Sequence, residues 1–264
     1  MIPRDVWMQR ILDGKILDEG GSSITLISSY RPQAKLLYFR EVEQEPEIPF
    51  AESILYQDDD LLVADKPHFL PVTPGGRYVE ECLLNRLRRR TGLVDLAPLH
   101  RIDRATAGLV LFSSNKETRG RYAGLFLRGE AVKSYQALAA CTSAPEESLW
   151  VVKNRIERSD LLFRMQVVSG KTNTNSVINL LEWCNGIARF SLQPLTGKTH
   201  QLRLHLSGLG FGILNDRLYP ELQPESPDNF AAPLQLLAKM ISFRDPLSHE
   251  VREFVSAREL SVVI

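Results

Sequence analysis

The chain has 264 residues, of which 44% are hydrophobic and 24% charged, and its formal net charge at pH 7 is zero. That length suits one large domain, or a large and a small one, and the composition excludes a disordered or collagen-like chain. No run of about 18 apolar residues lacks a charge and no signal-peptide pattern is present, so we expect a soluble cytoplasmic protein.

Residues 1–48 are predicted to form a small N-terminal extension. A short helical pattern begins near Val6, turns follow at DGK and EGG, and strand-like apolar runs lead to LLYF. The next stretch, EVEQEPEIP, contains four glutamates and two prolines without apolar periodicity, which is typical of a linker. We therefore place a boundary near residue 48, with the main domain over residues 49–264.

The main domain opens with a strand, an acidic turn and a second strand in SILYQDDDLLVADKP, and its last two residues end the second strand. A helix follows in ECLLNRLRRRTG, where Leu83, Leu84 and Leu87 share one face and the arginines occupy the other. LVLFSS then predicts a compact apolar strand, and NKETRGRYAGLFLRG predicts a helix.

Strand patterns dominate the remainder of the chain. They are found at residues 132–141, 148–157, 162–170, 176–184 and 188–194. THQLRLHLSGLG then has a helical pattern, and a long loop over residues 215–233 separates it from LQLLAKMISF. Because strands outnumber helices and often follow one another, we expect an α+β domain with a large antiparallel share, not a doubly wound parallel sheet.

Basic residues gather between positions 86 and 133. Eleven lysines and arginines stand there against four acids, an excess of seven on a chain that is neutral overall. Phosphate contacts favour basic surfaces, so this asymmetry allows a basic face for nucleic acid. A set of solvated helix faces would give the same count, and both interpretations stay open.

The stretch LHRIDRATAGLVLF, residues 99–112, places a histidine, two arginines and an aspartate in a predicted loop directly before an apolar strand. Loops in such positions commonly carry function. Asp103 in this loop suits a nucleophile, a general base or a turn cap that accepts backbone amides. Spacing alone leaves these roles open.

LHRIDRATAGLVLF resembles the HRLDxxTSGL signature of RluA-type RNA pseudouridine synthases. Three further segments occur in that family's order, spanning roughly residues 54–219: ILYQDDDLLVADKPHFLPVTPGG, VKSYQALA and PLTGKTHQLRLHLSGLGFGILNDRLY. The resemblance implies the pseudouridine synthase fold, in which helices flank a mixed, largely antiparallel central sheet. It also implies a cleft for RNA beside Asp103.

The resemblance implies a role for each matching residue. Asp103 would be the catalytic carboxylate, and Arg203 would pair with it, which would favour its ionised form. Tyr135 would pack on the target base and, with Asp103 and Arg203, complete the predicted catalytic set. Arg101 would enter the RNA stack where that base leaves, and Leu202 would be an apolar wall beside it.

Three more residues of the same motifs complete the predicted substrate-binding set: His100, Thr199 and His200. The chain departs from the family pattern at Ala105 and Ala107, at Lys198 in place of the usual arginine, and at Asn215, where glycine is common. None of these departures removes a proposed catalytic group.

The activity that the resemblance implies is isomerisation of a specific uridine to pseudouridine in ribosomal or transfer RNA. The base must leave the helix before its glycosidic bond is broken and remade. A covalent adduct and a glycal-like intermediate are both compatible with one aspartate. The reaction requires neither an organic cofactor nor a metal, and RNA is the expected partner, with no membrane and no obligatory protein partner.

Alternatives remain at several points. A non-catalytic RNA-binding protein with the same fold and basic groove is the main rival to an enzyme. The N-terminal extension faintly resembles an S4 RNA-binding module, although a purely structural role would also fit. His200 and His205 lack HExxH spacing, and the three cysteines form no CxxC pair, so neither a metal site nor a disulfide framework is predicted.

Overall fold

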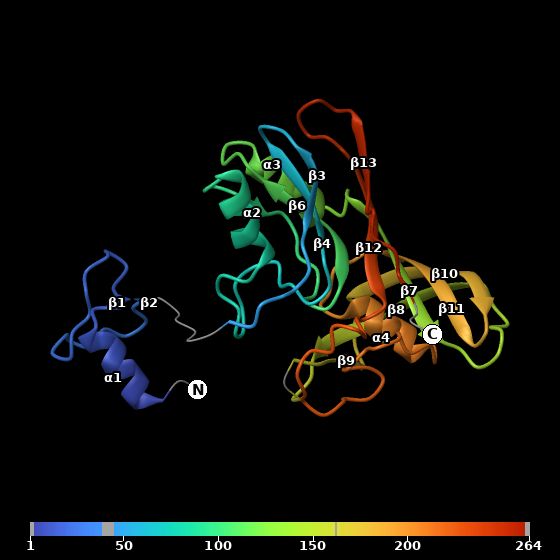
Figure 1. Ribbon diagram of the computed structural model, residues 1–264, viewed down its shortest axis with the longest axis horizontal. Coiled ribbons are helices and arrows are strands. Elements are labelled where there is room, and N and C mark those ends of the chain that lie inside the picture. The colour runs from blue at the N-terminus through green and yellow to red at the C-terminus, as the bar shows by residue number, and fades with distance from the viewer. Residues whose placement is uncertain (1–2, 39–44, 162, 262–264) are drawn as a thin grey trace. The chain divides into compact units, whose positions relative to one another are not determined.

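The computed structural model describes residues 3–38, 45–161 and 163–261, and it divides into two units, Met1–Glu45 and Pro46–Ile264 (Figure 1). In the first unit, helix α1 (Arg4–Leu12) accompanies a two-stranded antiparallel sheet of β1 (Ile16–Leu17) and β2 (Leu37–Tyr38). The ring of Trp7 meets Tyr38 edge to face at 5.1 Å. The first four residues of the predicted linker, 41–44, lie outside the described part of the chain.

The second unit is built on one 11-stranded sheet, counted over the described residues. The strand order is β3-β4-β6-β12-β7-β11-β10-β8-β9, with β13 beside β12 and β5 beside β6. Neighbouring strands run antiparallel except β12 and β6, which are parallel. The strands are β3 (Ser53–Gln57), β4 (Leu61–Lys66), β5 (Ala97–Pro98), β6 (Ala107–Ser113), β7 (Val132–Ala140), β8 (Leu149–Arg158), β9 (Met165–Val168), β10 (Thr174–Cys184), β11 (Ile187–Pro194), β12 (Leu236–Arg244) and β13 (Val251–Val255).

This arrangement confirms the predicted α+β class with a mixed, largely antiparallel sheet. The sequence patterns did not assign a type to the segment that forms β12 and did not find β13. The two strands form a hairpin in which β12 inserts between β6 and β7. The partners of β12 are distant in sequence, so no local pattern predicts that it inserts between them.

Three helices pack against the sheet: α2 (Leu83–Thr91), α3 (Arg119–Leu127) and α4 (Gln201–Gly208). Successive residues of a strand point to opposite faces. Accordingly Leu62 and Ala64 of β4 pack in the cluster that contains α2, whereas Leu61 and Val63 pack in the cluster that contains α3. The two helices therefore cover opposite faces of the same strands.

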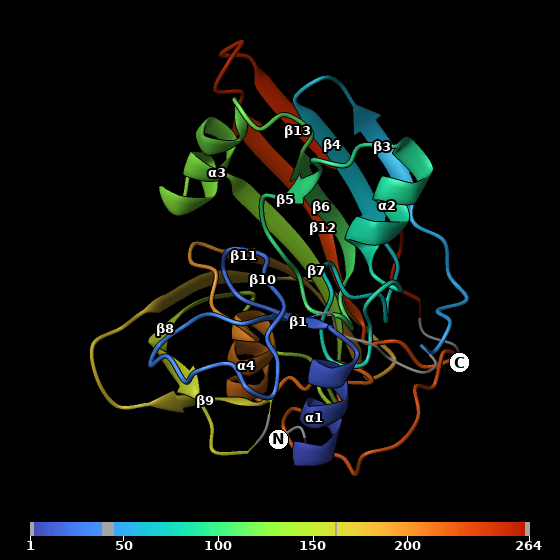
Figure 2. The same cartoon turned by 90° about the vertical axis from the view of Figure 1, so that its left-hand side faces the viewer.

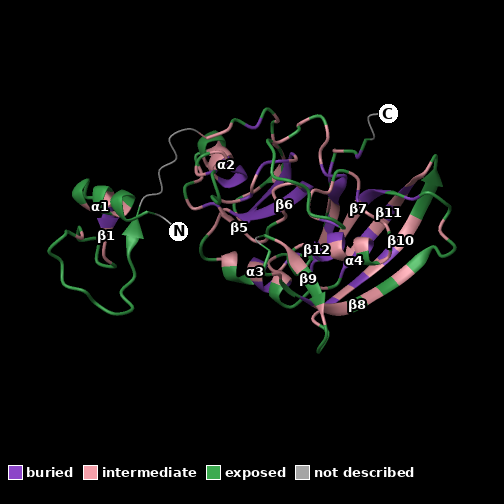
Figure 3. Cartoon of the chain, turned by 90° about the horizontal axis from the view of Figure 1, so that it is seen from below, coloured by how far each residue is buried: buried purple, intermediate pink, exposed green. Residues whose placement is uncertain are grey.

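Helix α4 packs on the other half of the sheet, beside β7, β10 and β11 (Figure 2). Its Leu202 and Leu206 are buried among residues of those strands. Burial falls from the centre of the sheet toward its edge, since every residue of β6 is buried whereas one of the ten residues of β8 is (Figure 3). The beginning of β6 and the beginning of α4 are thus both anchored in core.

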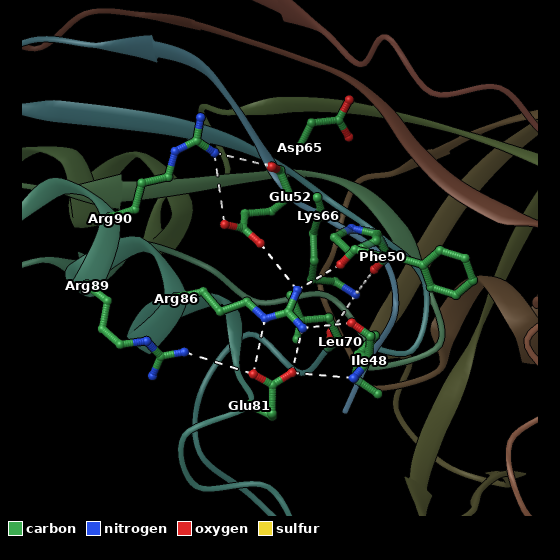
Figure 4. A network of polar contacts seen from close by, with 12 residues as sticks. Ile48, Phe50, Glu52, Asp65, Lys66, Leu70, Glu81, Arg86, Arg89 and Arg90 are labelled. Carbon is green, nitrogen blue, oxygen red and sulfur yellow. Dashed lines mark hydrogen bonds and ion pairs between the residues drawn. The ribbon is translucent and has the colours of Figure 1, made fainter. Parts of the chain in front are cut away.

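The predicted amphipathic helix is confirmed, and its arginines are tied to acids and carbonyls from other segments. Leu83, Leu84 and Leu87 of α2 are buried. Arg86 donates to the carbonyl oxygens of Ile48 at 2.8 Å and Phe50 at 2.7 Å. It also forms ion pairs with Glu81 and Glu52 (Figure 4). This network fixes the beginning of the second unit against α2.

Candidate active site

A cleft of about 730 Å³ opens between the two halves of the sheet, and it contains every site residue predicted from sequence. Its walls come from residues 71–75, from the loop before β6, from the beginning of β7, and from the loop and first turn of α4. The predicted residues that line it are His100, Arg101, Asp103, Tyr135, Thr199, His200, Leu202 and Arg203. Segments up to 100 residues apart in sequence, such as those of Asp103 and Arg203, therefore converge at one place.

Asp103 lies in a loop whose backbone carbonyls accept hydrogen bonds from neighbouring residues. The Thr106 amide donates to the carbonyl of Asp103 at 3.1 Å, and the Lys66 ammonium donates to the carbonyl of Arg104 at 3.1 Å. Lys66 is completely buried, and it also donates to the carbonyls of Pro67 and Leu70. Burial holds the pKa of Lys66 well below its usual range, while the charge of Asp103 favours its charged form. The sequence analysis missed this support.

The carboxylate of Asp103 faces the cleft beside Arg203. Its side chain is 28% exposed, and its Oδ2 accepts a hydrogen bond from Nη1 of Arg203 at 3.3 Å. Arg203 is 5% exposed, and its Nε and Nη2 donate to the two carboxylate oxygens of Asp216 at 2.7 and 2.6 Å. Burial would lower the pKa of Arg203, but Asp216 and then Asp103 raise it. Arg203 is thus a permanent cation with one nitrogen left for Asp103.

Asp216 and Tyr219 are two residues of the site that the sequence analysis did not find. Asp216 is 1% exposed and accepts hydrogen bonds from the amides of Leu218 and Tyr219 besides its bond to Arg203. The ring of Tyr219 lies under the Arg203 guanidinium, 5.2 Å from its centroid. Both residues lie at the end of the motif PLTGKTHQLRLHLSGLGFGILNDRLY, after its glycine-rich turn, but the motif was not used to assign them a role.

His200 stands at the entrance to α4 in a left-handed conformation, with φ of 55°. Its Nδ1 lies 2.9 Å from the hydroxyl of Tyr219, and its Nε2 lies 3.7 Å from Oδ2 of Asp103. Burial lowers the pKa of His200, and Asp103 partly opposes that effect. His200 is therefore a largely neutral neighbour of the carboxylate near pH 7.

Tyr135 and Leu202 form an apolar wall of the cleft. Leu202 belongs to the core cluster beneath α4, and the half-buried ring of Tyr135 packs against that cluster. Burial raises the pKa of the Tyr135 hydroxyl, and the negative charge of Asp103 raises it further. The phenol consequently stays neutral across the physiological range and offers a flat surface to an aromatic ligand.

His100 has a structural partner as well as a place in the cleft wall. Its Nε2 accepts a hydrogen bond from the amide of Leu111 at 3.1 Å, and its ring stacks on Phe126 at 4.7 Å. Burial lowers the pKa of His100 to about 3, with a smaller effect of Lys133. The unprotonated ring is what the amide bond requires.

The lysines and arginines of the basic stretch differ in their surroundings. Six of its members form ion pairs with acids: Arg86, Arg89, Arg90, Arg104, Lys116 and Arg128. By contrast, Arg101 and Lys133 line the cleft, and neither has an ion pair with any acid in the described residues. Lys198 lines it too. Of the other three members, Arg88 and Arg119 donate to backbone carbonyls, and Arg121 is exposed. Most of the stretch is thus held by acids or carbonyls, so the basic face is narrower than the sequence count suggests.

Within residues 3–38, 45–161 and 163–261, no group of three or more His, Cys, Asp and Glu side chains is arranged to hold a metal ion. His205 instead lies beside Asn154 and Thr174, at 3.1 and 3.2 Å from Nε2. The same described residues contain no helix long and apolar enough to cross a membrane.

Comparison with known proteins identifies the family. The family model described as RNA pseudouridylate synthase matches residues 60–208. An uncharacterized RNA pseudouridine synthase of Synechocystis is 32% identical over 219 residues, which cover 82% of this chain and 74% of the relative. The dual-specificity RNA pseudouridine synthase RluA of Haemophilus influenzae is 30% identical, over 81% of this chain and 96% of the relative.

Solved structures agree on the fold. The human RNA pseudouridylate synthase domain containing 1 superimposes with a TM-score of 0.66 at 24% identity, covering 81% of this chain and 86% of that chain. The human RNA pseudouridylate synthase domain containing 4 superimposes with a TM-score of 0.60 at 27% identity, covering 79% of this chain and 88% of that chain. The chain therefore belongs to the RluA-type RNA pseudouridine synthases and is an isomerase of that family.

Proposed function

We propose that this enzyme converts a uridine of ribosomal or transfer RNA to pseudouridine, with Asp103 as its catalytic carboxylate. The observation that carries the proposal is the 3.3 Å contact between Asp103 and a buried arginine at the floor of an open cleft. A carboxylate that is ionised, held by a cation and still partly exposed is equipped to act on a substrate.

The reaction changes bonds at three atoms of the nucleoside. The bond from C1′ to N1 breaks, a new bond forms from C1′ to C5, C5 loses a proton and N1 gains one. Asp103 would assist the first step by attacking C1′ or by removing a proton from C2′ of the sugar. Both routes start from an ionised carboxylate beside the ribose.

The other cleft residues would bind the flipped nucleotide. Tyr135 and Leu202 would hold the uracil between them, and the neutral phenol of Tyr135 is unsuited to be a base. Arg101 is exposed at the rim, where it would enter the RNA stack vacated by the uridine. Lys133 would meet a backbone phosphate. These contacts offset the few kcal/mol that flipping costs.

The names of relatives support RNA as the substrate, and one of them names transfer RNA. Besides the dual-specificity enzyme of Haemophilus influenzae, the mitochondrial tRNA pseudouridine(32) synthase of Saccharomyces cerevisiae is 28% identical over 63% of this chain and 36% of that protein. A substrate that exposes a loop uridine would suit a cleft recognising an extruded base.

The test is release of tritium from RNA labelled at C5 of uridine, because C5 loses its hydrogen in the reaction. Asp103→Asn should lower the rate by at least about a thousandfold, as expected when a catalytic group is removed, while RNA binding is largely retained. Asp95→Asn is the matched control, since this carboxylate pairs with Lys116 outside the cleft. Full turnover in Asp103→Asn would exclude the proposed role.

The same assay addresses the rival function. A wild-type protein that binds structured RNA in a salt-dependent way but releases no tritium from ribosomal or transfer RNA would be a non-catalytic RNA-binding protein. The occupied positions of Asp103, Tyr135 and Arg203 in the cleft favour the enzyme.

A further inference from the structure

The loop between α4 and β12 carries an aspartate that reaches the residue next to Asp103. Asp228 lies in this loop with its side chain 11% exposed. Its Oδ1 accepts a hydrogen bond from Nη2 of Arg104 at 2.7 Å, and its Oδ2 accepts one from Nη1 at 2.9 Å. This two-point pairing fixes the direction of the guanidinium, because both groups are planar.

The same carboxylate also holds the part of the cleft wall formed by residues 71–75. Oδ2 of Asp228 accepts hydrogen bonds from the Tyr78 hydroxyl at 3.3 Å and from Nη2 of Arg77 at 3.1 Å. Tyr78 is buried and pairs through its backbone with Gly75, the last residue of the 71–75 wall. Asp228 therefore joins the Asp103 loop to the 71–75 wall.

Neighbouring residues anchor the loop itself. Two residues after Asp228, the ring of Phe230 packs edge to face on Phe50 and Phe69, at 5.7 and 5.1 Å. At the beginning of the loop, Asp216 holds Arg203. The loop thus carries one aspartate that holds the arginine paired with Asp103 and another that holds the arginine following it.

Opposite charges stabilise the pairing of Arg104 with Asp228. The Arg104 hydrogen bond lowers the pKa of Asp228, and Asp228 raises the pKa of Arg104 despite the opposing effect of burial. Both groups are charged at neutral pH. Since Arg104 is directed to Asp228, Arg203 is the arginine that forms an ion pair with Asp103 among the described residues.

We propose that Asp228 is a positioning residue, which fixes the Asp103 loop against the 71–75 wall so that the catalytic carboxylate is correctly oriented before RNA enters. The inference rests on the proposed role of Asp103. Misplacement of a reacting group by about 1 Å can lower a rate up to a hundredfold, so a residue that touches no substrate can still control turnover.

The experiment compares single-turnover rate constants, with enzyme in saturating excess over C5-tritiated, unmodified transfer and ribosomal RNA. Asp228→Asn keeps the volume of the side chain but removes its charge. We expect its rate constant to fall about tenfold, with RNA affinity changed less than about twofold, because the binding cations remain in place. The rate constants of Arg104→Gln and of the double variant should fall no further than that of Asp228→Asn, since all three variants lose the ion pair between Arg104 and Asp228.

The control is Glu225→Gln, an exposed carboxylate of the same loop, which should leave the rate constant unchanged. A purely structural role would lower the amount of folded protein without changing the single-turnover rate constant, because the remaining folded enzyme still saturates the RNA. That result, or an unchanged rate in folded Asp228→Asn, would overturn the inference. Absence of tritium release from the wild type would instead refute the proposed function.

A second measurement does not need turnover. Amide hydrogen exchange over residues 101–106 reports local opening of the Asp103 loop. We expect roughly tenfold faster exchange there in Asp228→Asn and none of this increase in Glu225→Gln. Exchange that is equal in the two variants would also overturn the inference.

Discussion

The arginines of α2 and the cations of the cleft come from the same basic stretch of sequence, yet their surroundings differ. Arg86 is 14% exposed and sits between two glutamates and two carbonyl groups. Lys133 is half-buried in the cleft wall without such partners in the described chain. The comparison teaches that a lysine or arginine is available to RNA only where the fold brings no acid to it.

The largest effect should follow the loss of a paired arginine. Arg86→Met would leave the largely buried Glu52 and Glu81 without their nearest cation, at a cost of about 2–3 kcal/mol in the free energy of unfolding. Urea denaturation would measure it. The salt dependence of RNA binding should stay at the wild-type value, and a change in that slope would break the distinction between the two groups.

A matched variant sharpens this first prediction. Arg90 lies one turn further along α2 with its side chain 55% exposed, 4.0 Å from Glu52. Exposed pairs contribute little, so Arg90→Met should change the unfolding free energy by less than about 0.5 kcal/mol. If Arg90→Met lowered the unfolding free energy as much as Arg86→Met, burial would not explain the difference between the two arginines.

A smaller effect, on binding instead of stability, should follow the loss of a cleft cation. Lys133→Met should weaken binding of substrate RNA by about 1.5 kcal/mol, roughly tenfold, because a contact between charged groups is lost. The slope of log Kd against log salt concentration should decrease by about 0.7–0.9. Lys133→Arg should restore the slope, and an unchanged slope in Lys133→Met would contradict the phosphate contact.

The smallest effect should come from a surface pair within the same stretch. Lys116 pairs with Asp95 at 2.7 Å, with side chains 67% and 46% exposed. Lys116→Met should alter both the unfolding free energy and the RNA affinity by less than about 0.5 kcal/mol. An effect on the salt slope equal to that of Lys133→Met would place Lys116 in the RNA path and widen the basic face.

Much of the fold was predictable because its local patterns are strong. The leucines of α2 and the apolar run of β6 predicted both elements, and the residues predicted from the motifs all line one cleft. Their catalytic and binding roles stay predictions.

The partners of those residues could not be predicted, for a physical reason. Asp216 and Asp228 lie in a segment without apolar periodicity, and their importance comes from arginines that are distant in sequence but close in the fold. Lys66 looked like the end of a strand, whereas it is a buried donor to three carbonyls. Side-chain contacts between segments have no local signature.

The position of β12 has a consequence for biosynthesis. This strand separates β6 from β7, although those two are nearest neighbours among the long strands along the chain. During translation, β6 and β7 emerge from the ribosome about a hundred residues before β12, the strand that pairs with both of them. Such non-local closure slows folding and leaves strand edges exposed. A nascent chain would therefore remain inactive, and dependent on protection by chaperones, until residues 236–244 have been made.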